Sequence, residues 1–233
     1  VTGSSNNSAL ENKVTIAGST VGSVYGGYIQ AGTGSATQNI VDIASSNVNK
    51  KVYGGCVDGA GSATQNIVTI ASSTTKTVYG GYVSTGNANQ NEVHIVSSTV
   101  GGELCCSYVG DTGSATQNVV DISSSTINAV YGSNVSTGNA LENEVHIASS
   151  TIKGIVYGGK SSNGNADSNK VKIASSTVGG VVYGSSVTTG SATRNIIDIA
   201  SSTINAVYGA KISNGNADSN EVKITNSSVA GTV

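Results

Sequence analysis

The sequence GSATQNIVDIASSNVNKKVYGG at residues 34–55 contains the pattern that decides the fold of this chain. Within it, Asn39 is followed two and four residues later by Val41 and Ile43, and this spacing recurs along the chain. The asparagines that open the repeated units lie 25 to 27 residues apart; they are Asn12, Asn39, Asn66, Asn91, Asn118, Asn143, Asn169, Asn195 and Asn220. A near-constant spacing of this size is typical of solenoids and propellers, in which one structural unit is repeated.

Each repeated unit has the alternation expected of β-strands. From Asn39 to Ile43, the Asn, Val and Ile side chains fall on one face of an extended chain and the intervening residues on the other. We expect a second strand through Ser46, Val48 and Val52. The glycine-containing pieces TGN, NGN and YGG are expected to separate the strands as turns. The chain has no proline, which fits strands that donate N–H groups inside a stack.

These features predict an all-β fold for residues 1–233, a single β-solenoid domain with about nine coils of 25–27 residues. The specific architecture that we predict is a right-handed parallel β-helix, in which equivalent residues of successive coils stack ~4.8 Å apart. Because the chain has no starting Met and no secretion signal, we expect it to be a segment of a longer protein.

The outward-facing positions provide a test of this stacking within the sequence. Like charges directly opposite each other on neighbouring strands are destabilising. In the column formed by the third residue after each asparagine, no two neighbours carry the same formal charge at neutral pH. The column reads Thr15, Asp42, Thr69, His94, Asp121, His146, Lys172, Asp198 and Lys223. One coil per repeat, in register, is therefore consistent with the charge pattern.

Composition excludes several classes of partner. The net charge is −2, from 11 basic and 13 acidic residues spread along the chain, so no basic patch indicates nucleic acid. No stretch approaches the roughly 20 apolar residues of a membrane-spanning helix, and we expect no membrane insertion by this segment.

The three cysteines are interpreted as structural thiols. Cys105 and Cys106 occupy positions where other repeats have Tyr-Gly, and Cys56 takes the place of a tyrosine. Units that hold Cys56 and Cys105 are two coils apart, or ~9.6 Å, which exceeds the ~7 Å Cα limit of a disulfide. We therefore predict no bond between Cys56 and either of the other two cysteines.

The repeated polar and aromatic residues have structural explanations. Stacked asparagine amides can pass hydrogen bonds from coil to coil, so the nine asparagines are predicted to form a structural ladder. Stacked tyrosines at a corner are likewise interpreted as packing; they are Tyr25, Tyr53, Tyr79, Tyr131, Tyr157, Tyr183 and Tyr208.

No set of residues predicts catalysis or a cofactor. The acidic residues are dispersed among the repeats, and those of the outward column are interpreted as a salt-bridged ladder. His94 and His146 flank Asp121 in that column, but imidazoles ~9.6 Å apart cannot both reach one ion at ~2.1 Å without tilting strongly inward. We therefore predict no catalytic residues, no metal site and no cofactor.

The combination of VYGG with SATQNIVDI resembles the repeats of autotransporter passengers and filamentous surface adhesins of Gram-negative anaerobes, over essentially residues 1–233. This resemblance implies a secreted β-solenoid displayed on the cell surface. The partners that we expect are a host or bacterial surface receptor, or a second copy of the protein.

We therefore expect a structural stalk or adhesin segment, extracellular or at the cell surface, and not an enzyme. A lateral contact strip is predicted at the first residue after the asparagines, formed by Ile40, Ile67, Val119 and Ile196. Two alternatives stay open. One is a polysaccharide-processing β-helix enzyme, which requires acidic residues converging in a groove. The other is an ice-binding solenoid, suggested by a column of threonines that begins at Thr20.

Overall fold

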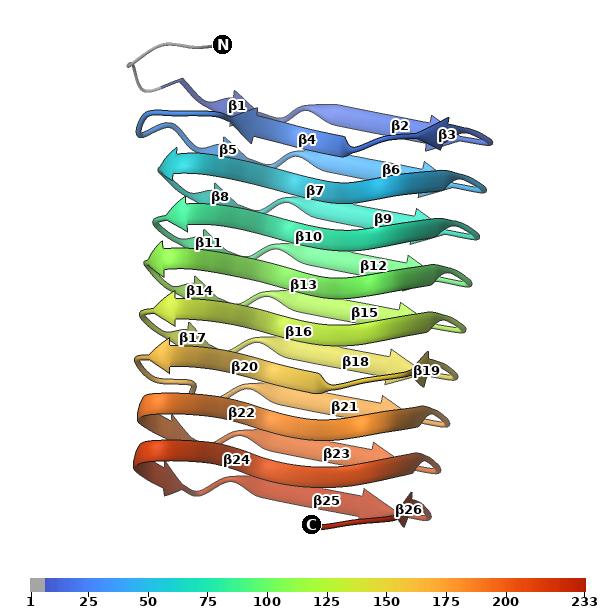
Figure 1. Ribbon diagram of the computed structural model, residues 1–233, viewed down its shortest axis with the longest axis vertical. Coiled ribbons are helices and arrows are strands. Elements are labelled where there is room, and N and C mark those ends of the chain that lie inside the picture. The colour runs from blue at the N-terminus through green and yellow to red at the C-terminus, as the bar shows by residue number, and fades with distance from the viewer. Residues whose placement is uncertain (1–6) are drawn as a thin grey trace.

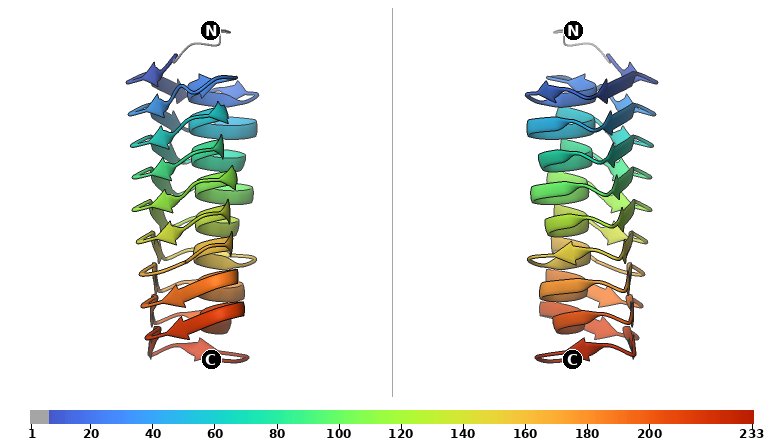
Figure 2. Two further views of the ribbon diagram at one scale, coloured as in Figure 1. Left: turned by 90° about the vertical axis from the view of Figure 1, so that its left-hand side faces the viewer. Right: turned by 90° about the vertical axis from the view of Figure 1, so that its right-hand side faces the viewer.

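The computed structural model describes residues 7–233 as a stack of parallel strands, with no helix in this part of the chain (Figure 1). All strand pairs are parallel and join equivalent residues of successive repeats; for example, Val41 pairs with Val68 and Ile43 with Ile70. The two side views show the strands of each repeat stacked above one another along the long axis (Figure 2). The predicted β-solenoid is confirmed.

Two sheets form most of the stack. The back sheet in Figure 1 has nine strands of five residues, and eight turns separate the first from the last. These strands are β2 (Lys13–Ala17), β6 (Ile40–Ala44), β9 (Ile67–Ala71), β12 (Glu92–Val96), β15 (Val119–Ser123), β18 (Glu144–Ala148), β21 (Lys170–Ala174), β23 (Ile196–Ala200) and β25 (Glu221–Thr225).

The front sheet contains the longer strands of the stack together with a few short ones. Its members are β3 (Thr20–Val21), β4 (Val24–Ile29), β7 (Asn47–Ala60), β10 (Thr74–Thr85), β13 (Thr99–Thr112), β16 (Thr126–Thr137), β19 (Thr151–Ile152), β20 (Val156–Asn163), β22 (Thr177–Thr193), β24 (Thr203–Asp218) and β26 (Ser228–Val229).

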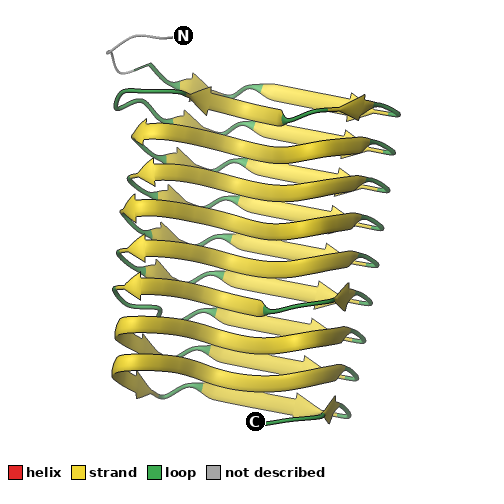
Figure 3. Ribbon diagram, viewed as in Figure 1, coloured by secondary structure: helices red, strands yellow, loops and turns green. Residues whose placement is uncertain are grey.

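Two-residue strands lie before the back sheet in many of the coils. They pair as β1 (Ala9–Leu10), β5 (Ala36–Thr37), β8 (Ala63–Thr64) and β11 (Ala88–Asn89), and as β14 (Ala115–Thr116) with β17 (Ala140–Leu141). Most loops lie at the narrow edges of the stack; others join the two-residue strands to the back sheet, and residues 22–23 and 153–155 interrupt the front sheet (Figure 3).

The coil is right-handed, as predicted. In Figure 1 the N-terminus is at the top; β6 runs from left to right at the back, and β7 then runs from right to left at the front. Seen from the N-terminal end, the chain turns clockwise as it moves away, which defines a right-handed helix.

The prediction that YGG pieces separate the strands is wrong. Gly54 and Gly55 lie inside β7, and neither has a positive φ angle. A Cβ on Gly54 would lie 2.5 Å from the carbonyl oxygen of Gly80, and one on Gly55 would lie 2.5 Å from Nδ2 of Asn66. Close packing between coils and against the asparagine ladder therefore favours glycine at these two positions, whose equivalents on β13 are Cys106 and Ser107.

The sharp corners are formed instead by residues in the left-handed conformation directly before the ladder residues. Gln38, before Asn39, has φ 56°, and Ser45, before Ser46, has φ 49°. The pattern recurs in every coil, with Gly18 in the serine position of the first. A non-glycine residue in this conformation costs about 1–2 kcal/mol, so the corners must be held by other interactions.

The asparagines hold the first corner. Along the stack, the backbone N–H of each asparagine donates to Oδ1 of the next at 2.9–3.2 Å. Nδ2 donates to the same oxygen at 2.7–3.2 Å. From the second coil onward, Nδ2 also donates to an alanine carbonyl about one coil earlier. The nine side chains form one continuous hydrogen-bonded column.

A serine ladder holds the second corner. Each backbone N–H donates to Oγ of the next serine at 3.0–3.1 Å, and each Oγ donates to the carbonyl two residues earlier. The members are Ser19, Ser46, Ser73, Ser98, Ser125, Ser150, Ser176, Ser202 and Ser227. The backbone N–H groups at both corners are thus satisfied by side chains of the following coil.

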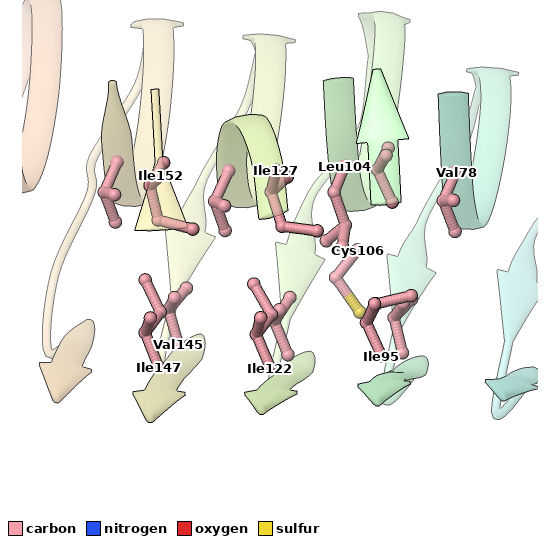
Figure 4. Packing of buried hydrophobic residues seen from close by; sticks show 14 of the residues in the cluster. Val78, Ile95, Leu104, Cys106, Ile122, Ile127, Val145, Ile147 and Ile152 are labelled. Carbon is pink, nitrogen blue, oxygen red and sulfur yellow. The ribbon is translucent and has the colours of Figure 1, made fainter. Parts of the chain in front are cut away.

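The apolar core lies between the two sheets. Ile95, Ile122 and Ile147 of the back sheet face Leu104 and Ile127 of the front sheet, and all are at most 2% exposed (Figure 4). Complete burial of a Val, Ile or Leu side chain contributes about 1.5–3 kcal/mol. A second cluster of buried Ala and Val side chains, including Ala36 and Val57, fills the edge beside the two-residue strands.

We predict that Asn118→Leu lowers the free energy of unfolding by about 3 kcal/mol or more. The Asn118 amide donates to the Ala88 carbonyl and to Asn143 Oδ1, and its oxygen accepts bonds from Asn91 and from the Ser107 hydroxyl. Each buried polar group left without a partner costs about 1–3 kcal/mol.

Chemical denaturation followed by circular dichroism measures the effect of Asn118→Leu. The matched control is Asn128→Leu at an exposed position of the same coil, which we expect to change stability by less than about 0.5 kcal/mol. Equal stability of the two variants would contradict a structural role for the ladder.

Candidate functional site

Ionisable side chains gather at the middle of the outer face of the back sheet. Three adjacent strands, β12, β15 and β18, place His94, Asp121 and His146 directly opposite one another in register. Nδ1 of His94 lies 3.1 Å from Asp121 Oδ2, and Nδ1 of His146 lies 2.9 Å from Asp121 Oδ1. One carboxylate therefore lies between two imidazoles.

Two glutamates complete this cluster. Glu92 precedes His94 by two residues, so both side chains fall on the same face of β12, and Glu144 precedes His146 in the same way on β18. Nε2 of His94 is 3.2 Å from Glu92 Oε2, and Nε2 of His146 is 3.0 Å from Glu144 Oε2. Both ring nitrogens of each histidine thus face a carboxylate oxygen. We call these five residues the histidine–carboxylate cluster.

The cluster is open to solvent. Its side chains are 32–47% exposed, so each ion pair contributes at most about 1 kcal/mol. A shallow cavity of about 660 Å³ adjoins it and is lined by His94, Asp121, Glu144, His146 and two lysines of β21, Lys170 and Lys172, together with small and apolar side chains.

The repeat spacing predicts His94, Asp121 and His146 in one column, and the structure shows them there. The expectation that the acids are dispersed is wrong at this point, since Glu92, Asp121 and Glu144 meet within one cluster. The sequence feature that indicates this cluster is the tripeptide EVH on β12 and β18, because residues two apart on a strand lie on the same face. Elsewhere in the column, Asp42 pairs diagonally with Lys13 of the adjacent column at 3.4 Å.

The predicted contact strip is discontinuous. Ile40 and Ile67 are direct neighbours, but Glu92 separates them from Val119, and Glu144 and Lys170 separate Val119 from Ile196. A groove of about 450 Å³ lies along the first pair, lined by Gln38, Ile40, Gln65, Ile67, Gln90 and Glu92. Ile196 is 39% exposed and stands alone between charged neighbours.

The tyrosines form stacked columns on the outer face of the front sheet. Rings of Tyr25, Tyr53 and Tyr79 stack at 4.9–5.2 Å, and a second run from Tyr131 to Tyr208 stacks at 5.1–5.4 Å. Because each ring face inside a run covers its neighbour, the columns present ring edges to solvent. This arrangement favours packing over a flat platform for sugar stacking.

The cysteines are buried and free. Cys105 continues the tyrosine column between Tyr79 and Tyr131. Cys106 points into the core (Figure 4), where its Sγ lies 3.1 Å from the Asn91 carbonyl oxygen. Burial raises the pKa of Cys56 to about 12, with the nearby Asp58 carboxylate adding to the effect, and burial also raises the pKa of Cys105 and Cys106.

Residues 7–233 contain no group of three or more His, Cys, Asp and Glu side chains that could hold one metal ion. In the same residues, no helix has the length and apolar character needed to cross a membrane. Comparisons with known proteins give no match: no protein-family model, no curated protein sequence and no solved structure is significantly similar to the chain.

We predict that the native protein does not react with a disulfide reagent such as DTNB at pH 8. A pKa near 12 leaves roughly one Cys56 thiol in ten thousand as the reactive thiolate at that pH, and burial blocks access to all three. Absorbance at 412 nm follows the reaction. All three thiols should react after unfolding in guanidinium chloride, whereas rapid reaction of one native thiol would contradict the burial.

Proposed function

We propose that this chain is a structural stalk or adhesin segment of a secreted or surface-displayed protein. The observation that carries the proposal is the unbroken column of hydrogen bonds from Asn12 to Asn220, which ties every coil to the next. Ladders at both corners, together with the core between the sheets, make the stack a stiff body in which each coil contacts only its neighbours.

The shape of the stack fits a spacer. Its first and last described coils lie at opposite ends of the long axis (Figure 1), and eight steps of ~4.8 Å separate the end strands of the back sheet by ~38 Å. Further coils can be added to a parallel stack with the same strand pairing and the same ladders. The resemblance of the repeats to surface adhesins supports an extracellular location.

The partner that we propose is a surface receptor or a second copy of the protein, bound along a lateral face. Ile40 and Ile67 lie side by side along a groove on the outer face of the back sheet, and aliphatic side chains in line can form contact surfaces. The glutamine side chains along its other wall can provide hydrogen bonds to a polar partner.

We do not propose a polysaccharide-cleaving enzyme. The gathered carboxylates of Glu92, Asp121 and Glu144 lie on an open sheet face and are each engaged with an imidazole. Ice binding is also not favoured, because the threonine column at the second corner is single. Thr74 pairs with Thr99, but the next outward column contains Lys76 and Gly101.

We predict that the double variant Ile40→Thr and Ile67→Thr weakens self-association or cell adhesion of the purified chain at least fivefold. The control is Val96→Thr, which removes a more exposed aliphatic side chain of the same sheet outside the groove. Analytical ultracentrifugation and a cell-binding assay measure the two activities. Unchanged behaviour of the double variant in both assays would remove the groove as a contact site.

Surface display is tested separately. Antibodies against this segment should label intact cells that produce the full-length protein, and protease added outside should remove the signal. Labelling that appears only after the cells are permeabilised would contradict the proposed location.

We also predict that the purified chain cleaves no polysaccharide. The measurement is release of reducing ends, or of unsaturated products, from neutral and acidic polysaccharides. Activity that is lost in Asp121→Asn and kept in Asp198→Asn would replace the stalk proposal with an enzyme centred on the histidine–carboxylate cluster.

A further inference from the structure

The histidine–carboxylate cluster contains two copies of one arrangement. In each copy, a histidine lies between Asp121 on the neighbouring strand and a glutamate on its own strand. Asp121 is an acceptor for both imidazoles, so a neutral histidine that donates Nδ1–H to it has its lone pair on Nε2. That lone pair then faces a glutamate oxygen, which is also an acceptor.

Two acceptors at 3.0–3.2 Å can be joined by a proton, which makes the ring an imidazolium that donates to the glutamate, or by a metal ion that takes the place of that proton. Two adjacent ligands of an ion bound at ~2.1 Å lie ~3.0 Å apart for a right angle and ~3.4 Å apart for a tetrahedral angle, so the observed separation lies within or close to this range. Histidines that bind metals usually donate their other ring N–H to a carboxylate, which fixes the tautomer and the ring orientation. Asp121 is placed to do this for both histidines at once.

We propose that β12 and β18 each bind one divalent transition-metal ion of the zinc or copper type. The ligands are His94 Nε2 and Glu92 in the first site, and His146 Nε2 and Glu144 in the second, with Asp121 as the positioning residue shared by both. One imidazole and one carboxylate suit these ions, whereas Ca²⁺ and Mg²⁺ prefer sites made of oxygen ligands alone.

The proposal involves two ions because the histidines are two coils apart, ~9.6 Å, and their Nε2 atoms face different glutamates. Each site supplies two protein ligands, which agrees with the finding that no three such side chains in residues 7–233 converge on one ion. The partly exposed side chains leave the other coordination positions to water or to a ligand from a binding partner.

The two sites are not equivalent. Glu144 and His146 lie beside Lys170 and Lys172 of β21, whose positive charges oppose a divalent cation. Glu92 and His94 have Ile67 and Thr69 as neighbours on β9. The site on β12 therefore binds the ion more tightly than the site on β18.

Zinc titration of the purified chain tests the proposal, independently of the proposed stalk function. The protein has only two histidines, so imidazole NMR signals report on each site without overlap from others. We expect two ions per chain by isothermal titration calorimetry, with His94 perturbed at lower zinc concentration than His146. Mg²⁺ and Ca²⁺ at the same concentrations should perturb neither.

Variants assign the ligands. His94→Gln and His146→Gln should each bind one ion, and the double variant none. Asp121→Asn should retain two ions with affinity lowered 10- to 100-fold, while Asp198→Asn, in the same column but outside the cluster, should bind as the unaltered chain does. Replacing Lys170 and Lys172 by Gln should tighten the site on β18 alone.

Three results would overturn the proposal. They are absence of zinc-induced changes in both imidazoles up to millimolar zinc, unchanged zinc binding in the double histidine variant, and loss of all binding in either single variant. The imidazole titration needs only the unaltered chain, so it stays decisive if a variant fails to fold; melting curves identify such variants.

Discussion

At the two corners of every coil, the backbone N–H of Asn or Ser donates to a side-chain oxygen of the next coil, and the rest of the structure depends on this arrangement. The residue before each corner has a left-handed conformation that is unfavourable for Gln or Ser, and the ladder bonds hold it there. An asparagine at one coil is thus a partner for its equivalents on both sides. A coil that shifted by one residue relative to its neighbours would lose these hydrogen bonds. The ladders therefore fix the register of the whole stack.

Fixed register determines what lies side by side on the outer faces. Residues 25 to 27 positions apart in sequence become direct neighbours. The surface therefore consists of columns in which each side chain contacts the equivalent side chains of the adjacent coils. Tyrosines stack in one column, and Lys160 lies about 6 Å from the ring centres of Tyr131 and Tyr157. In another column, the order His, Asp, His places a carboxylate between two imidazoles. Sequence changes of one or two residues per coil are therefore enough to build a local polar cluster on an otherwise repetitive surface.

The sequence alone predicted the strands of the back sheet, the parallel stacking and the column that holds His94, Asp121 and His146, because all three follow from periodicity. Features that depend on distances within a coil were missed. Gly54 is predicted to be a turn residue, but it lies within the long strand β7. Glycine is found there because the carbonyl of Gly80 leaves little room for a side chain. Gln38 carries no sign of a left-handed conformation, since its role comes from the ladder beside it. Glu92 was missed as a member of the cluster because side-chain reach, and not position alone, joins it to His94.

Residues that differ from their equivalents in other coils fall into two groups, buried residues of the front sheet and outward residues of the back sheet. Cys105 and Cys106 replace Tyr and Gly on β13, yet both are buried, and Cys106 fills space between Ile95 and Leu104. The Cys106 departure alters packing in the core, and the Cys105 departure interrupts the stacked tyrosine column. Glu92, His94, Glu144 and His146 lie at outward positions that vary from coil to coil, where the core places no demand on the side chain. Because the ladders and the core stabilise the repeat, the outward positions can vary. Binding or catalytic residues can therefore be introduced there without loss of the fold.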